Sequence, residues 1–188
     1  MPAAEKIIYL TFDDGPVPGP TEFVLDVLQS KGAKATFFCI GDNVLRHPDI
    51  FRKVKEQGHA IGNHTFNHLK GWNHATKAYV ENTVKCEEVI GEGYKLFRPP
   101  YGRITRSQIK ALKEHPIVMW DVLTHDYLAS LKEEQCLSGS IKATRPGSIV
   151  VFHDSLKAQK NMKYVLPRYV DHFTDLGFVF KSLPPRGR

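Results

Sequence analysis

The stretch from Tyr9 to Pro16 restricts the fold most, because an apolar run that begins at Ile7 stops abruptly on two adjacent carboxylates, Asp13 and Asp14. The run predicts a buried strand, and a Gly-Pro turn follows the acids. In parallel α/β folds the carboxyl ends of the strands build the active site, so acids at this point favour a functional role. The alternative is ordinary turn chemistry of an Asp-Gly-Pro sequence.

Short apolar runs alternate with amphipathic segments along the chain, which predicts strand-helix units around a parallel sheet. The expected strands are Ile7–Phe12, Ala35–Ile40, His59–Asn63, Leu96–Arg98, Ile117–Asp121, Ser148–His153 and Phe178–Leu183. The expected helices are Thr21–Lys31, Pro48–Gln57, Ala75–Ile90, Thr105–Glu114, Leu131–Ala143 and Asn161–Leu176. This pattern fits either an open doubly wound sheet or a barrel. No glycine-rich dinucleotide or phosphate loop follows a strand, which argues against the commonest open sheet.

Length and composition indicate one domain over residues 1–188. A hydrophobic content of 41% and a charged content of 24% are typical of a globular protein, and no apolar stretch is long enough to span a bilayer. The net charge of +6 would suit an anionic polymer, but Lys and Arg are spread along the chain. We therefore expect no nucleic-acid partner and no membrane insertion, and we expect a monomer.

Cys39, Cys86 and Cys136 are odd in number and widely spaced, which argues against a disulfide framework and a thiolate zinc site. The first residues lead directly into the first expected strand, without a basic region and an apolar signal segment. As given, the sequence predicts a cytoplasmic protein; an exported protein is expected only if the sequence has been trimmed.

Reactive side chains also follow the other expected strands. His64 and His68 come after the third strand, and on a helical turn both imidazoles could reach one metal ion. Such a histidine pair could equally be structural. A carboxylate from a neighbouring strand would complete a facial set that leaves positions open for water and substrate.

Residues from Arg98 to Gly102 end the fourth expected strand with a double proline, which stiffens the loop and removes two amide donors. This segment could be a rigid turn, or Arg98 could pair with a carboxylate and the Tyr101 amide could stabilise an oxyanion. His153 ends the sixth expected strand, and Asp126 or, alternatively, Asp121 could orient an imidazole. No Gly-x-Ser-x-Gly elbow is present, which argues against covalent serine hydrolysis.

Taken in order, these motifs resemble those of the polysaccharide deacetylases, carbohydrate esterase family four, with the nodulation-factor-type deacetylase homology domain. The motifs are Thr11 to Pro16, His64-Thr65-x-x-His68, Arg98 to Gly102, Asp126, and Val151-x-His153. The resemblance covers residues from about 7 to 183. It implies an α/β fold that is a single-domain distorted (β/α) barrel of about seven parallel strands.

The resemblance also implies a role for each motif residue. Asp14, His64 and His68 would be the metal ligands, Asp13 the general base and His153 the general acid. The bound ion would be a divalent metal, zinc or alternatively cobalt or nickel.

Further residues would support these groups. Arg98 would pair with Asp13, Asp126 would hold His153, and the amide of Tyr101 would face the oxyanion. The residues implied in substrate binding are Pro100, Tyr101, Trp120, Tyr127 and Val151.

Three positions depart from the family pattern. Tyr127 stands where the family usually has Trp, Leu123 where it often has another Asp, and Val151 where it usually has Leu. The implied reaction is hydrolysis of N-acetyl groups on N-acetylglucosamine-containing oligo- or polysaccharides, with release of acetate. The alternatives are hydrolysis of O-acetyl esters on xylan, hydrolysis of a small non-sugar amide, or a catalytically silent sugar-binding barrel. Loss of Asp13, His68 or His153 would have supported the silent barrel, but all three are present.

Overall fold

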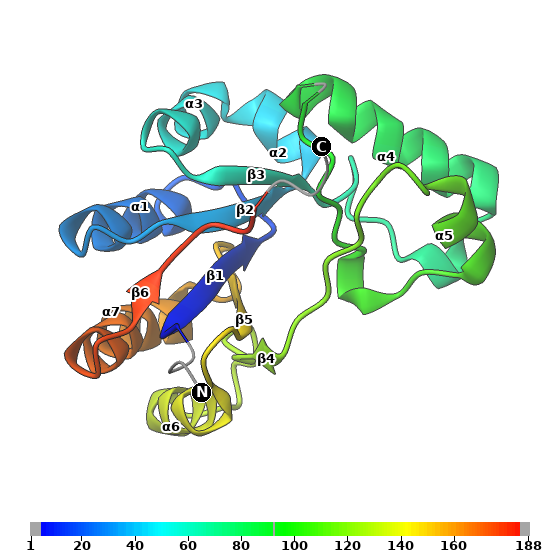
Figure 1. Ribbon diagram of the computed structural model, residues 1–188. Helices are drawn as coiled ribbons and strands as arrows, with labels where there is room; N and C mark the ends of the chain where they lie inside the picture. Colours follow the sequence, from blue (N-terminus) through cyan, green and yellow to red (C-terminus); the bar gives the residue numbers. More distant parts are fainter. Residues whose placement is uncertain (1–4, 92, 185–188) are drawn as a thin grey trace.

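Strands and helices alternate in the computed structural model, which describes residues 5–91 and 93–184 (Figure 1). The strands are β1 (Ile7–Asp13), β2 (Ala35–Cys39), β3 (Ala60–Asn63), β4 (Val122–Leu123), β5 (Ile149–His153) and β6 (Val179–Phe180). The α-helices are α1 (Pro20–Ser30), α2 (Gly41–Arg46), α3 (Pro48–Glu56), α4 (Thr76–Ile90), α5 (Arg106–Ala111), α6 (Glu133–Ala143) and α7 (Gln159–Asp175). Two 3₁₀ helices are η1 (Gly71–Asn73) and η2 (Pro100–Gly102).

The strands form a parallel sheet that closes on itself. Their order is β3-β2-β1-β5-β4, and β6 pairs with the start of β1. Isolated bridges join Asn63 to Phe97 and Phe97 to Ile117. The segment that begins at Ile117 continues into β4, and β4 pairs with β5. The ring of strand pairs is thus completed. The fold is therefore the predicted distorted (β/α) barrel.

The predicted count of about seven strands is corrected to six in the described residues. The expected strands Leu96–Arg98 and Ile117–Asp121 are reduced to the two isolated bridges, and only Val122–Leu123 pairs regularly in this half. In the second of these segments, Nε and Nη2 of the Arg98 side chain donate to the carbonyls of Val118 and Met119. These carbonyls are thus bonded to a guanidinium instead of a neighbouring strand.

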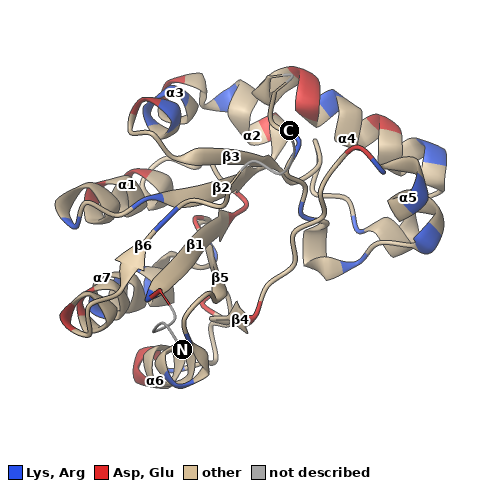
Figure 2. Ribbon diagram, in the orientation of Figure 1, with Lys and Arg blue, Asp and Glu red and all other residues tan. Residues whose placement is uncertain are grey.

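The expected helices are all present, although their ends differ. The largest difference is α5, which ends at Ala111 instead of Glu114, and α2 was not predicted. The helices lie outside the strands (Figure 1). Along α3 and α4, basic residues (Lys and Arg) are interspersed with acidic ones (Asp and Glu) (Figure 2). Among the residues described, none of the helices has the length and apolarity that a membrane span requires.

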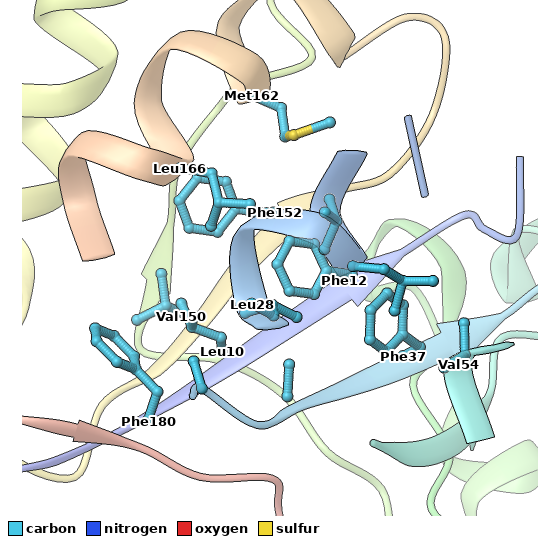
Figure 3. Close-up of a cluster of buried hydrophobic side chains, with 14 of the residues drawn as sticks. Leu10, Phe12, Leu28, Phe37, Val54, Val150, Phe152, Met162, Leu166 and Phe180 are labelled. Atoms are coloured by element: carbon cyan, nitrogen blue, oxygen red, sulfur yellow. The ribbon is translucent and has the colours of Figure 1, made fainter. Parts of the chain in front are cut away.

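Side-chain alternation along the strands creates two cores, because successive residues point to opposite faces. The outer core lies between the strands and helices such as α1 and α7, and Leu10, Phe12 and Phe152 belong to it (Figure 3). The small inner core lies inside the barrel: Phe38, Leu96 and Leu183 are buried, and the partly buried Tyr9, Val118 and Ile149 pack against them. The inward-facing side chains of each strand therefore line the interior of the barrel, and the last of them lie at its carboxyl end.

Candidate active site

Asp13 on β1 and His153 on β5 are directly paired in the register of the two strands. On β1, Leu10 and Phe12 belong to the outer core, so the alternating positions Thr11 and Asp13 face the interior of the barrel. An acid and an imidazole thus meet at the carboxyl end of the barrel because of strand pairing alone. This is the edge at which the sequence predicted an active site.

Asp14, His64 and His68 form a group of possible metal ligands whose donor atoms all lie within 4.8 Å of one another. It is the single group of three or more His, Cys, Asp or Glu side chains with such geometry within residues 5–91 and 93–184. Asp14 Oδ1 lies 3.3 Å from His68 Nε2 and 3.8 Å from His64 Nε2. This oxygen is buried and has no hydrogen-bond partner in the described structure. A buried, unsatisfied carboxylate oxygen between two imidazoles fits a cation.

The hydrogen bond of His64 fixes its tautomer. Its Nδ1 lies 2.8 Å from the carbonyl oxygen of Arg98, which can only accept, so Nδ1 carries the proton. The lone pair of Nε2 is therefore directed away from this bond and is available to a metal. Thr65 and His68 adopt positive φ of 62° and 57°, which bends the loop so that both imidazoles reach Asp14.

His68 is neutral at physiological pH. Burial lowers its pKa, the neighbouring His64 lowers it further, and the opposing effect of Asp14 leaves the pKa at about 4. A neutral imidazole has the lone pair that metal coordination requires.

Arg98 lies behind Asp13 and is completely buried in the barrel. Its Nη1 donates to Asp13 Oδ1 and to Thr11 Oγ1, each at 2.7 Å, and its guanidinium stacks on Phe38 at 4.1 Å. Burial alone would raise the pKa of Asp13, but the charge and hydrogen bond of Arg98, together with the neighbouring His64 and His153, outweigh this effect, and the pKa is lowered. Asp13 is therefore held as a carboxylate.

Asp126 lies behind His153 in the same way and is 1% exposed. Its Oδ1 accepts from His153 Nδ1 at 2.7 Å, and its Oδ2 accepts from the His153 amide at 2.8 Å. Burial alone would lower the pKa of His153, but the charge and hydrogen bond of Asp126 raise it to about 9. The imidazole is therefore protonated at neutral pH.

The loop of the double proline brings Tyr101 to the rim of the site. Tyr101 has a φ of 59°, an unusual conformation for a residue other than glycine, and its ring packs against His68 with the centroids 4.7 Å apart. Such backbone conformations are enriched at functional sites. Asp14 and His68 share this positive φ, so three strained residues lie at one site.

These residues surround a pocket of about 560 Å³, a size within the usual range of small-molecule sites. Of the predicted substrate-binding residues, Tyr101, Trp120, Tyr127 and Val151 line it. Pro100 does not line it: this residue is buried, and Pro99 lines the pocket in its place. His125, which the sequence left without a role, is exposed and contacts Tyr127.

Sequence reasoning missed three cations in the pocket wall, Lys70, Arg103 and Lys157. The first two lie within two residues of a motif, at His68 and Gly102, and this proximity was the only available signal.

Asp154, next to His153, is a further residue that the sequence did not single out. It is fully buried, and its carboxylate accepts from the Gly15 amide at 2.9 Å and from the Thr21 hydroxyl at 2.6 Å. Burial raises its pKa to about 7. A methyl group on Gly15 would lie 1.9 Å from Asp154 Oδ2, so only glycine fits here. Asp154 thus fixes the turn that carries Asp14.

Known proteins are similar to this chain in sequence and in fold. Residues 1–120 match the family described as "Polysaccharide deacetylase". A peptidoglycan-N-acetylglucosamine deacetylase of Bacillus cereus is 34% identical over 190 residues, which cover 97% of this chain and 89% of that protein. A chitooligosaccharide deacetylase of Azorhizobium caulinodans is 36% identical over 157 residues, covering 80% and 74% of the two chains.

Among solved structures, the crystal structure of the Bc1960 peptidoglycan N-acetylglucosamine deacetylase superimposes with a TM-score of 0.90 at 29% identity. The match covers 97% of this chain and 88% of that one. With this fold, and with matches in sequence over most of its length, the chain belongs to the polysaccharide deacetylase family.

Proposed function

We propose that this protein is a metal-dependent hydrolase that removes N-acetyl groups from N-acetylglucosamine-containing oligo- or polysaccharides and releases acetate. The observation that carries the proposal is the pairing of an ionised Asp13 with a protonated His153 in one pocket. General base and general acid catalysis need these opposite protonation states at the same pH. The names of the Bacillus cereus and Azorhizobium caulinodans relatives support the same substrate class.

Asp14, His64 and His68 would hold the metal, and the orphaned Asp14 Oδ1 together with the fixed tautomer of His64 supports this assignment. A divalent ion, zinc or alternatively cobalt or nickel, would supply Lewis-acid polarisation of the acetyl carbonyl and activation of a water molecule.

Asp13 would take the proton from the attacking water, since Arg98 keeps its carboxylate ionised. Its Oδ1 is engaged by Arg98, and its Oδ2 lies 3.9 Å from His64 Nε2, beside the ligand group. Arg98 therefore orients the carboxylate as well as lowering its pKa. The Tyr101 amide would donate to the developing oxyanion.

His153 would protonate the departing amine of the sugar. Asp126 accepts from Nδ1, so Nε2 would be the atom that gives the proton. An amine is a poor leaving group, so this acid is required for an amide and matters less for an ester. Trp120, Tyr127, Val151 and Pro99 would form the wall around the acetyl group.

We expect the enzyme to act as a monomer on its carbohydrate substrate, without nucleic acid or membrane insertion. Hydrolysis of O-acetyl esters on xylan or of a small non-sugar amide would use the same residues, and a silent sugar-binding barrel would use none of them for chemistry.

Acetate release separates these functions. Chelated enzyme would be assayed with and without added zinc or cobalt on N-acetylglucosamine oligomers and on acetylated xylan. We expect metal-dependent release from the amino-sugar oligomers. Release from xylan alone would identify an esterase, and no release from either, with metal bound, would overturn the proposed function.

The variant His68→Ala tests the ligand group. It should lower both the metal content of the purified protein and the rate, because one of three ligands is lost. Unchanged metal content would show that the ion is bound elsewhere.

A further inference from the structure

Trp72 is an exposed aromatic side chain beside the active-site pocket that the mechanism does not use. It lies in η1, four residues after the candidate ligand His68, and it is 56% exposed. Tryptophan is enriched at binding surfaces, because its ring combines a large apolar face with a polar N–H group.

The indole ring of Trp72 is held in place. Its Nε1 donates to the carbonyl of Ile104 at 3.2 Å, and the Gly71 amide donates to the carbonyl of Arg103 at 3.0 Å. The buried Gln108 adds a hydrogen bond of 2.8 Å to the carbonyl of Gly71. A Cβ at Gly71 would lie only 2.4 Å from the Arg103 carbonyl, so the two loops approach as closely as glycine permits. The exposed ring is therefore preorganised and not a mobile surface side chain.

Arg103 connects this ring to the pocket. Its guanidinium lies 4.2 Å from the centre of the Trp72 ring, and the same side chain lines the active-site pocket. Arg103 belongs to none of the ion pairs found in the described residues. Its donors are free to bind a ligand that also contacts the indole.

The chemistry of this pair matches a pyranose ring. A sugar presents an apolar face of C–H groups, which packs on an aromatic surface, and a rim of hydroxyl and acetamide oxygens, which accept hydrogen bonds from a guanidinium. Lys70, also in the pocket wall, lies two residues before Trp72 and adds another donor to the same side.

We propose that Trp72 and Arg103 form a subsite for a sugar residue adjacent to the one that is deacetylated. This inference rests on the proposed function, and it makes the preferred substrate an oligosaccharide or polymer instead of a single amino sugar. The gain from chain length would come from stacking on Trp72.

The test compares kcat/KM for the shortest N-acetylglucosamine oligomer that the wild type hydrolyses with the value for the tetramer. In Trp72→Ala the tetramer should lose roughly 5-fold to 10-fold, and the shortest oligomer should be almost unaffected. Trp72→Phe should keep most of the tetramer rate, because the aromatic face remains. Equal losses on both substrates, or no loss on either, would overturn the subsite.

Arg103→Gln and Arg168→Gln form a matched pair. Arg168 stacks on Tyr164 at 4.0 Å, but it lies on α7 and does not line the pocket. Only Arg103→Gln should weaken tetramer hydrolysis. An equal effect of both changes would contradict the proposal.

Binding can be followed without turnover. Trp72 and Trp120 are the two tryptophans of the chain, so chelated, metal-free protein titrated with the tetramer should show a fluorescence change that is reduced in Trp72→Phe. An identical change in this variant would exclude the subsite. If the wild type released no acetate from any oligomer, the proposed function would fail, and this titration would still decide whether Trp72 binds a glycan.

Discussion

The ends of β1 and β5 carry two buried ion pairs with opposite orientations. At β1 the acid, Asp13, faces the pocket and its cation, Arg98, lies behind it; at β5 the imidazole of His153 faces the pocket and its acid, Asp126, lies behind. The pKa of Asp13 is lowered, whereas that of His153 is raised to about 9. A buried ion pair thus prepares a proton acceptor on β1 and a proton donor on β5, its neighbour in the sheet.

The two hidden partners differ in what else they bind. Arg98 also bonds to Thr11, Val118 and Met119, and so joins β1 to the irregular half of the barrel. Asp126 accepts only from the backbone and side chain of His153 among the hydrogen bonds of the described residues. Loss of Arg98 should therefore affect the fold, and loss of Asp126 should affect the chemistry of one imidazole.

Removal of the Asp13 charge should have the largest effect. Asp13→Asn keeps the shape of the side chain but removes the proposed base, so kcat should fall by roughly 10²- to 10⁴-fold. Metal content should stay at the wild-type level, because Asp14, His64 and His68 are unchanged. Acetate release and metal analysis on the same preparation measure both quantities. A kcat near that of the wild type would remove Asp13 from the role of base.

Arg98→Met should be the most destabilising of these changes. It leaves Asp13 as a buried carboxylate without its cation, and the free energy of unfolding should fall by roughly 3–5 kcal/mol at neutral pH. Urea denaturation measures this loss. The double variant with Asp13→Asn should recover part of it, since no uncompensated charge remains. A single variant as stable as the wild type would show that the pair is not the link between the two halves of the barrel.

Asp126→Asn should change the pH dependence more than the stability. In the wild type His153 is protonated below pH 9, so kcat/KM should fall as the pH rises through the pKa of about 9. Without the negative charge, burial dominates and lowers the pKa of His153, so the alkaline limb should move to lower pH. A pH profile of kcat/KM checks this, and an unmoved limb would identify another group as the acid.

Thr11→Val should have the smallest effect. Thr11 accepts from Arg98 and donates to the carbonyl of Val150 at 2.9 Å, so its loss should cost roughly 1–2 kcal/mol of unfolding free energy. Asp13 keeps its contact with Arg98, and kcat should stay close to the wild-type value. A large fall in kcat would mean that Thr11, and not Asp13, is the important partner of Arg98.

The regular half of the barrel could be predicted from the sequence, because local patterns determine it. Alternation on β1 places Leu10 and Phe12 outside, and the strand then ends on its acids. The irregular half could not be predicted in the same way. Whether Val118 and Met119 join a strand or bond to Arg98 depends on contacts about 20 residues away, which no local pattern records.

The candidate site shows the same division. The motifs indicated the residues that the structure brings together at the ends of β1, β3 and β5. They did not indicate Lys70 or Lys157, because a lysine in a pocket wall looks like any surface lysine in a sequence. Asp154 was missed because its partner, Gly15, is distant in the chain.

That distance affects the order in which the site is assembled. Asp154 and Gly15 are 139 residues apart, whereas the three candidate ligands all lie between Asp14 and His68. During synthesis the amino-terminal part of the chain emerges with every ligand but without the carboxylate that fixes the turn of Asp14. Contacts between such distant residues form slowly, after the chain has closed a large loop. Tight binding of an ion by the candidate ligands should therefore depend on completion of the barrel, and a nascent chain that lacks β5 should bind it only weakly.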